Sequence, residues 1–258
     1  MGIYFLETGA SQRPSKVIYD RADAAVTTLT PDEVDLEAAM EGARWFHFTG
    51  ITPALGATAR RTVTEAARAA KAAGATVSCD LNFRKKLWTT AEAQATMRPL
   101  MEHVDVCIAN EEDADMCLGM TAGATDVHGA ELDEAGYVEL AKKLKREFDF
   151  EAVAITLRES FSASHNGWSA ILHDDKDCAT PVRSTRYDIQ IVDRVGGGDS
   201  FASGLIAGLL QKDDTRDALE FAVAASCLKQ TIPGDFNLVT RAEVDALAAG
   251  DGSGRVQR

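Results

Sequence analysis

Residues 193–201 read DRVGGGDSF: an acid, three consecutive glycines, a second acid, and then sequence that favours a helix. Ordering three glycines has a large entropic cost, and many Gly runs are simply flexible loops. Here, however, the run directly precedes the small and apolar residues SFASGLIAGLL, residues 200–210. Free N–H groups at a helix N-terminus bind anions, and glycines let an anion approach closely. The stretch therefore predicts an anion site at Gly196, Gly197 and Gly198.

Asp199 follows the glycines and has the wrong charge for holding a phosphate. A carboxylate in this place suits a general base, which takes the proton from a hydroxyl as its oxygen attacks phosphorus. The glycines would then stabilise charge on the transferred phosphoryl group. The chain contains neither G-x-x-x-x-G-K-[ST] nor H-R-D, the motifs of P-loop and protein kinases. The sequence thus predicts phosphoryl transfer by a different kind of kinase.

Composition excludes several classes of protein. The 258 residues carry a net charge of -13, and no stretch is rich in Lys or Arg, which argues against nucleic acid and anionic membranes as partners. No apolar run approaches the ~20 residues of a membrane helix. Five scattered cysteines without a C-x-x-C pattern predict reduced core thiols in a soluble, cytoplasmic protein: Cys79, Cys107, Cys117, Cys178 and Cys227.

Short apolar runs alternate with helix-forming segments along most of the chain. This alternation predicts an α/β fold whose mostly parallel sheet is covered on both faces by helices. The expected strands are residues 44–50, 76–82, 105–110 and 152–157, and the expected helices between them are 58–74, 89–103, from 111, and 136–148.

The two ends of the chain read differently from its middle. Residues 1–7 and 15–22 are β-type runs separated by a Gly- and Pro-containing turn, which predicts a hairpin. Thr30, Pro31 and Glu33 predict the start of a helix over residues 30–40. Farther on we expect a β-meander in residues 167–174 and 182–192 and two helices in residues 200–211 and 215–230. Residues 250–258 are expected to form a frayed tail. We expect a partial β-lid (1–25), one α/β domain (26–249) and the tail.

Polar residues follow several of the expected strands. In open parallel sheets, ligands bind beyond the carboxyl ends of the strands, so these positions predict a site. The residues concerned are Asp80, Asn82 and Arg84 after one strand, Asn110 and Glu111 after the next, and Thr156 and Arg158 after a third.

Residues 193–208, DRVGGGDSFASGLIAG, resemble the C-terminal signature of the PfkB (ribokinase-like) sugar kinases, usually Asp-Thr-x-Gly-Ala-Gly-Asp. Arg194 replaces the usual Thr and Gly197 the usual Ala. DLNFRKKLW (80–88) and ANEEDA (109–114) resemble the family's Asp-x-Asn-x-Arg and Asn-Glu-x-Glu segments, with Asp113 where Glu is commoner. The resemblance implies a ribokinase-like α/β/α fold, ATP and Mg²⁺ as cofactors, and a homodimer formed through the lid.

Within this family the chain most resembles the kinases of 2-keto-3-deoxygluconate, because of residues 1–7, 13–22, 47–55, 80–88, 156–160 and 233–237. This resemblance implies phosphorylation of the sugar acid's terminal hydroxyl, with Asp199 as base. Tyr4, Tyr19 and Arg21 would line the sugar-acid pocket from the lid, and Arg84 would reach the substrate from the sheet. An Arg offers a planar, bidentate fork for the carboxylate of a keto acid.

On the nucleotide side, the resemblance places ATP against Thr156, Arg158 and the 196–198 loop, with the adenine near residues 222–230. Asn110 and Glu111 would organise Mg²⁺ and its waters near the phosphates, and no residue is expected to hold a structural metal.

Structural explanations stay open for several of these residues. Tyr4 and Tyr19 could be cross-strand packing, and Arg21 a solvated charge. Arg84 could pair with Asp80, and Asn110 and Glu111 suit the start of a helix.

Family members normally carry about a hundred further residues before the position that matches Met1, and a domain with these residues has an ordinary size. The resemblance implies that this chain lacks that segment, which supplies the first strands, part of the lid and a Gly-Gly-x-x-x-Asn stretch at the sugar. Two alternatives therefore remain: another sugar kinase of the family, such as a fructokinase or a ribokinase, and an inactive, nucleotide-binding remnant.

Overall fold

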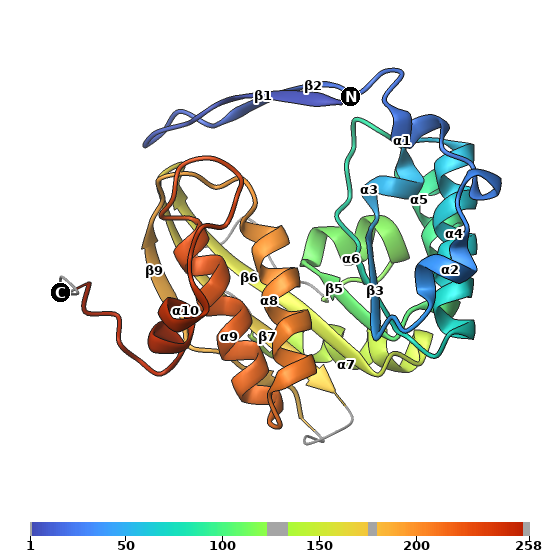
Figure 1. Cartoon of the computed structure of the whole chain (residues 1–258). Coiled ribbons are helices and arrows are strands. Elements are labelled where there is room, and N and C mark those ends of the chain that lie inside the picture. The colour runs from blue at the N-terminus through green and yellow to red at the C-terminus, as the bar shows by residue number, and fades with distance from the viewer. Residues whose placement is uncertain (1, 123–133, 175–179, 255–258) are drawn as a thin grey trace. The chain divides into compact units, whose positions relative to one another are not determined.

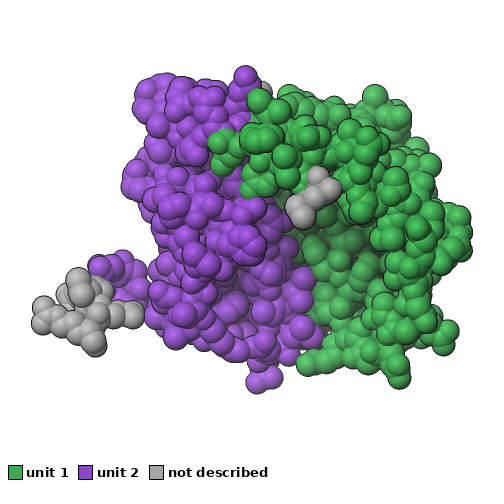
Figure 2. Space-filling view, turned by 45° about the horizontal axis from the view of Figure 1, so that its top comes forward, with its two compact units in different colours: residues 1–6, 17–125, 133–155 green, residues 7–16, 126–132, 156–258 purple. Residues whose placement is uncertain are grey.

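The computed structural model describes residues 2–122, 134–174 and 180–254. It divides the chain into two compact units, which Figure 2 shows in different colours. The first consists of residues 1–6, 17–125 and 133–155, and the second of residues 7–16, 126–132 and 156–258. Each unit has its own core.

The first unit contains a parallel sheet. Its strands are β3 (Trp45–Thr49), β4 (Thr76–Asp80), β5 (Val106–Ala109) and the first residues of β6 (Ala152–Ser162), hydrogen-bonded in that order (Figure 1). The register pairs Phe48 with Cys79, Cys79 with Cys107, and Cys107 with Val153. The predicted strands and their parallel pairing are confirmed. Four of the predicted free thiols lie buried, and Cys178 lies outside the described residues.

The helices of this unit connect successive strands. They are α3 (Ile51–Ala54), α4 (Ala57–Ala72), α5 (Thr90–Leu100), the short 3-10 helix η2 (Met101–His103), α6 (Glu111–Leu118) and α7 (Glu134–Phe148). On α4, Val63, Ala67 and Ala70 are buried, spaced so that they share one face. The long predicted helices are confirmed.

The predicted helix over residues 30–40 is wrong as a single element. A 3-10 turn, η1 (Pro31–Glu33), carries the expected capping box of Thr30 and Glu33 and then ends. Asp35 begins a new helix, α2 (Leu36–Met40), because its side chain accepts a hydrogen bond from the N–H of Ala38. A side-chain cap at this position competes with continuation of the first turn.

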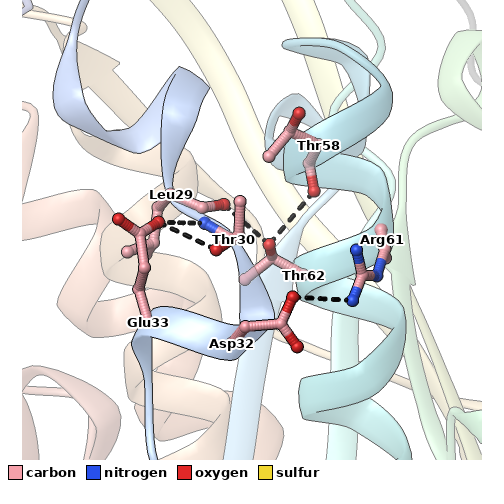
Figure 3. A network of polar contacts seen from close by, with 7 residues as sticks. All are labelled: Leu29, Thr30, Asp32, Glu33, Thr58, Arg61 and Thr62. Atoms are coloured by element: carbon pink, nitrogen blue, oxygen red, sulfur yellow. Dashed lines mark hydrogen bonds and ion pairs between the residues drawn. The ribbon is translucent and has the colours of Figure 1, made fainter.

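Polar contacts join this segment and Leu29, which follows the short helix α1 (Ala25–Thr28), to α4, as Figure 3 shows. The Thr62 hydroxyl lies 2.8 Å from the carbonyl oxygen of Leu29 and 3.0 Å from that of Thr58. Arg61 forms an ion pair with Asp32 at 3.0 Å. The segment is therefore held to the surface of α4.

The N-terminal strands β1 (Ile3–Glu7) and β2 (Lys16–Asp20) form the predicted hairpin (Figure 1). Within the described part of the chain these two strands pair only with each other. Ile3, Phe5 and Ile18 are 46%, 59% and 56% exposed, respectively.

The second unit contains the rest of β6, the strands β7 (His165–Asp174), β8 (Val182–Arg183) and β9 (Tyr187–Gln190), and three helices. Both β8 and β9 pair with β7 in antiparallel fashion, which confirms the meander. The helices are α8 (Gly197–Gln211), α9 (Thr215–Lys229) and α10 (Arg241–Ala248). The sequence interpretation did not include α10, although Thr240 and Glu243 form a capping box at its start.

Small residues let α8 and α9 pack closely. A β-carbon built on Gly204 would lie 3.0 Å from the Cα of Ala222, and one built on Gly208 would lie 2.8 Å from the Cα of Ala218. Because these glycines are four residues apart, they lie on one face of α8. This contact explains the small residues that follow the glycine run, and it fixes the direction of α8.

Candidate active site

The glycine loop is held by its surroundings. Gly196 is the N-cap of α8 and has φ of 78°. A β-carbon on Gly196 would lie 2.3 Å from the carbonyl oxygen of Asp235, so both the backbone conformation and the space require glycine. The buried hydroxyl of Ser226 donates to the carbonyl of Gly197 at 2.7 Å. The first part of the loop is therefore fixed against α9 and the segment after it.

Gly198 and Asp199 face outward. Both residues are exposed, and a β-carbon on Gly198 would meet nothing within 4 Å. Among the described residues, neither of their N–H groups has a backbone or side-chain acceptor. The Asp199 carboxylate likewise has no hydrogen bond or ion pair to any described residue. Free N–H donors at a helix N-terminus beside an unpaired carboxylate are what an anion site with an adjacent base requires.

Asp193, the first acid of the signature, is buried and joins two loops. Its Oδ1 accepts from the N–H of Val195 at 3.1 Å, and its Oδ2 accepts from the N–H of Gly234 at 3.0 Å. The sequence interpretation used Asp193 only as part of the motif. Its role in shaping the loop requires the position of Gly234, which lies 41 residues farther along the chain.

Arg194, the departure from the usual Thr, connects the glycine loop to the turn between β6 and β7. Its Nη2 lies 3.2 Å from the carbonyl oxygen of Ala163 and 3.3 Å from Oδ1 of Asn166. Burial lowers the pKa of Arg194, and the positive charge of Arg158 lowers it further. Two guanidinium groups thus influence each other beside the loop.

The prediction that Thr156 and Arg158 follow a strand is wrong. Both residues lie within β6, which extends to Ser162. The parallel ladder with β5 ends at the pair Ala109 and Ile155, and β6 then continues beside β7. Thr156 still comes directly after the last parallel pair. Arg158 is exposed and has no ion pair among the described residues, so its charge is available to a ligand.

In the first unit, the carboxyl ends of β3 and β4 come together. The N–H of Gly50 donates to the carbonyl of Asp80 at 2.8 Å, and the side-chain amide of Asn82 donates to the Thr49 hydroxyl at 3.1 Å. Asn82 has φ of 40°, which places a non-glycine residue in the left-handed region. Such backbone strain is concentrated at functional sites.

Arg84 and Asp113 lie near each other after the end of β4. The Nη1 of Arg84 donates to the carbonyl of Phe83 at 2.9 Å. Asp113 accepts from the N–H of Phe83 at 2.8 Å. Burial raises the pKa of Asp113 to about 6, although this hydrogen bond and the charge of Arg84 act in the opposite direction. The sequence interpretation noted Asp113 as a motif departure without assigning it to the site.

Asn110 is the N-cap of α6. Its Oδ1 accepts from the N–H of Asp113 at 2.8 Å, and Glu111 occupies the first turn. The structural explanation for Asn110 is therefore confirmed.

On the hairpin, Tyr4, Tyr19 and Arg21 form one cluster. The two tyrosine rings have centroids 6.2 Å apart, and the guanidinium carbon of Arg21 lies 4.0 Å above the Tyr19 ring. Cross-strand packing of the tyrosines is thus present. The cluster also presents two phenol groups and a cation on the same face of the hairpin.

Comparison with known protein families identifies a carbohydrate kinase. The family profile described as pfkB family carbohydrate kinase matches residues 1–239, so the chain belongs to this family.

Several similar proteins are named as kinases of dehydro-deoxy sugar acids. The chain is 50% identical to a solved 2-dehydro-3-deoxygluconokinase of Thermotoga maritima, and the two structures superpose with a TM-score of 0.89. The match covers 97% of this chain and 73% of that one. It is 35% identical to a 2-dehydro-3-deoxygalactonokinase of Haloferax volcanii, over 98% of this chain and 72% of the relative. A 2-dehydro-3-deoxygluconokinase of Thermoproteus tenax is 29% identical over 91% of this chain, which spans 63% of that relative.

Structural similarity extends to more distant kinases. The match to a putative ribokinase II of Escherichia coli has a TM-score of 0.73 at 20% identity, covering 96% of this chain and 71% of that one. The ribokinase-like fold expected from the sequence is confirmed. A search of the described helices finds none with both the length and the apolar composition to cross a membrane.

Proposed function

We propose that the chain catalyses ATP-dependent phosphorylation of 2-keto-3-deoxygluconate on its terminal hydroxyl. The observation that carries this proposal is the start of α8, where the free N–H groups of Gly198 and Asp199 stand beside an unpaired carboxylate. Asp199 takes the hydroxyl proton, and the glycine loop stabilises the charge on the transferred phosphoryl group. No further covalent chemistry is required of the protein.

The substrate side of the proposal rests on Tyr4, Tyr19, Arg21 and Arg84. A keto sugar acid carries a carboxylate, which an Arg guanidinium binds with charge-assisted hydrogen bonds. The Arg21 cation already lies over Tyr19 on the hairpin. The names of the similar kinases, which act on 2-dehydro-3-deoxy sugar acids, support the same substrate class. A neutral sugar would use amide and carboxylate partners for its hydroxyls in place of these arginines.

The nucleotide side consists of Thr156, Arg158 and the 196–198 loop. Arg158 has an available charge for the phosphates, and the glycine loop provides N–H donors. A putative ribokinase II with this fold has been solved with ATP and Mg²⁺. Asn110 and Glu111 offer amide and carboxylate oxygens, the ligands that Mg²⁺ and its waters prefer. The capping bond of Asn110 uses one lone pair of its Oδ1 and leaves the other available.

A homodimer formed through the hairpin is part of the proposal. Ile3, Phe5 and Ile18 are 46%, 59% and 56% exposed on a two-stranded sheet, and a second hairpin would cover such side chains. A cytoplasmic location is also proposed, because four free cysteines are buried without forming a disulfide.

The proposal is tested by measuring ADP release from the 258-residue chain with ATP and Mg²⁺. The acceptors are 2-keto-3-deoxygluconate, its galacto epimer, fructose and ribose, and Asp199→Asn is the control. Turnover with a sugar acid that Asp199→Asn abolishes is expected. Turnover with fructose or ribose alone would favour another sugar kinase of the family. Nucleotide binding without turnover would favour the inactive remnant.

A further inference from the structure

Lys229, the last residue of α9, is a lysine with no exposed surface. Lysines are almost never fully buried unless their charge is paired. Among the described residues, the only acceptor within reach of its Nζ is the carbonyl oxygen of Ile232, at 3.4 Å, and no carboxylate forms an ion pair with it. An ammonium group has three N–H donors, so most of its hydrogen-bonding capacity is unused. A buried cation with so few partners is costly and calls for an explanation.

The position of Lys229 links it to the glycine loop. A β-carbon built on Gly196 would lie 3.3 Å from the Cε of Lys229 and 2.3 Å from the carbonyl oxygen of Asp235. Burial lowers the pKa of Lys229, whereas the carboxylates of Asp193 and Asp235 raise it. The side chain therefore lies between residues 193–196 and residues 232–235, directly behind the N-terminus of α8.

A hydrogen bond between described residues also joins these two segments, because Asp193 accepts from the N–H of Gly234. Just before the second segment, the carbonyl of Gln230 accepts from the N–H of Asp193. An ammonium between them attracts the Asp193 and Asp235 carboxylates and the Ile232 carbonyl at once. Charges inside a protein attract each other more strongly than they do in water.

We propose that Lys229 is a positioning residue for phosphoryl transfer. Its ammonium holds residues 193–196 against residues 232–235, and thereby directs the free N–H groups of Gly198 and Asp199 toward the phosphate. It also places a positive charge behind the anion site. The inference rests on the proposed function, because it assumes that the bound anion is a phosphate of the nucleotide. Preorganised donors of this kind act mainly on the transition state.

This proposal differs from a purely structural role in what it predicts. Lys229 forms no ion pair with any described residue, so replacing it breaks no direct contact between charges. A positioning role predicts that kcat falls while thermal stability is maintained. A purely structural role predicts that thermal stability falls while kcat of the folded protein is maintained.

The test uses Lys229→Ala in the full chain, with propylammonium added to restore the missing part of the side chain. We expect kcat to fall at least 10-fold, with KM for the sugar acid changed less than threefold. Propylammonium should recover most of the loss, whereas 1-propanol, which has the same length but no charge, should not. Lys229→Met retains the bulk of the side chain and should show the same loss of kcat, which covers the case in which the alanine variant does not fold.

Lys212→Ala is the matched control. Lys212 directly follows α8 in the same unit and forms an ion pair with Asp245 at 2.9 Å. It lies at the other end of α8 from the glycine loop, so this variant should retain wild-type kcat.

A second measurement separates this inference from the proposed function. Calorimetric binding of inorganic tripolyphosphate reports on the anion site without any sugar, and Lys229→Met should weaken it at least 10-fold. If the wild type turns over no sugar acid but this weakening is found, the proposed function fails and the inference holds. If Lys229→Met keeps both kcat and tripolyphosphate affinity within threefold of wild type, the inference is overturned.

Discussion

The N-terminal hairpin and the glycine loop are supported very differently. In the hairpin, two strands pair only with each other within the described chain, and Tyr4 and Tyr19 are each 39% exposed. At the glycine loop, the Asp235 carbonyl leaves no space for a side chain at Gly196. The carbonyl of Gly197 accepts a hydrogen bond from Ser226, and Asp193 accepts one from the N–H of Gly234. Elements with few buried contacts open most readily, whereas packed ones are preorganised. We infer that the loop performs the chemistry and the hairpin selects the substrate.

The largest effect is expected from Asp199→Asn. The amide cannot accept the hydroxyl proton, so kcat should fall by about 10²–10⁴-fold, the usual contribution of a general base. Asp199 is exposed and has no partner among the described residues, so the thermal midpoint should stay unchanged. Steady-state kinetics and a thermal melt of the same preparation test both statements. A variant that keeps more than a tenth of wild-type kcat would remove Asp199 from the role of base.

A second prediction compares two neighbouring glycines. Gly196→Ala should destabilise the protein by about 2–4 kcal/mol, because alanine is strained at positive φ and its β-carbon overlaps the Asp235 carbonyl. Gly198→Ala should leave stability unchanged or raise it by up to about 1 kcal/mol, since its β-carbon meets open space in a helix. Urea unfolding of the two variants measures the difference. Equal stabilities would contradict the described packing of the loop.

Much of this architecture was predictable from the sequence, because it depends on local patterns. The alternation of apolar runs and helices predicted that β3, β4, β5 and the start of β6 are strands of a parallel sheet, and the run before Asp199 marked the start of α8. The mistakes have local causes too. The side chain of Asp35 divides a segment that was expected to form one helix. The end of β6 lies past Arg158 because the strand gains a new partner in β7.

Other parts of the site could not be predicted, because they depend on contacts between distant residues. Asp193 bonds to Gly234, and Lys229 lies against Gly196, at separations that no local pattern encodes. From the sequence alone, a lysine at the C-terminus of a helix is expected to be an ordinary charge that interacts favourably with the helix dipole. Its complete burial becomes visible only when α9 is packed against α8.

On the hairpin, the prediction concerns Arg21→Ala. Loss of a charge-assisted contact to the substrate carboxylate should raise KM for the sugar acid about 10- to 100-fold, as expected for a hydrogen bond to a charged group. Arg13→Ala is the control, because Arg13 lies in the turn of the same hairpin and pairs with Glu7 at 2.8 Å. It should change KM less than threefold. If the two variants behave alike, Arg21 has no special role in binding the substrate.

A further prediction concerns Asp113 and the pH dependence of stability. Its pKa is raised by burial from 3.8 to about 6 in the folded chain, so the unfolded state loses this proton first as pH rises. Stability should therefore decrease between about pH 4 and 6, by up to about 3 kcal/mol for a shift of about two pH units. Asp113→Asn has no proton to lose and can still accept from the Phe83 N–H. Urea unfolding at several pH values should show a smaller decrease for the variant, and parallel curves would contradict the raised pKa.

The most direct test of the division between hairpin and loop is to measure kcat and KM of Asp199→Asn and Arg21→Ala side by side, with ATP saturating and 2-keto-3-deoxygluconate varied. The account predicts that Asp199→Asn loses kcat with KM nearly unchanged. Arg21→Ala should raise KM with kcat within threefold of wild type. A loss of kcat in Arg21→Ala as large as that in Asp199→Asn, with KM unchanged, would contradict the account, because the hairpin would then act in the chemical step.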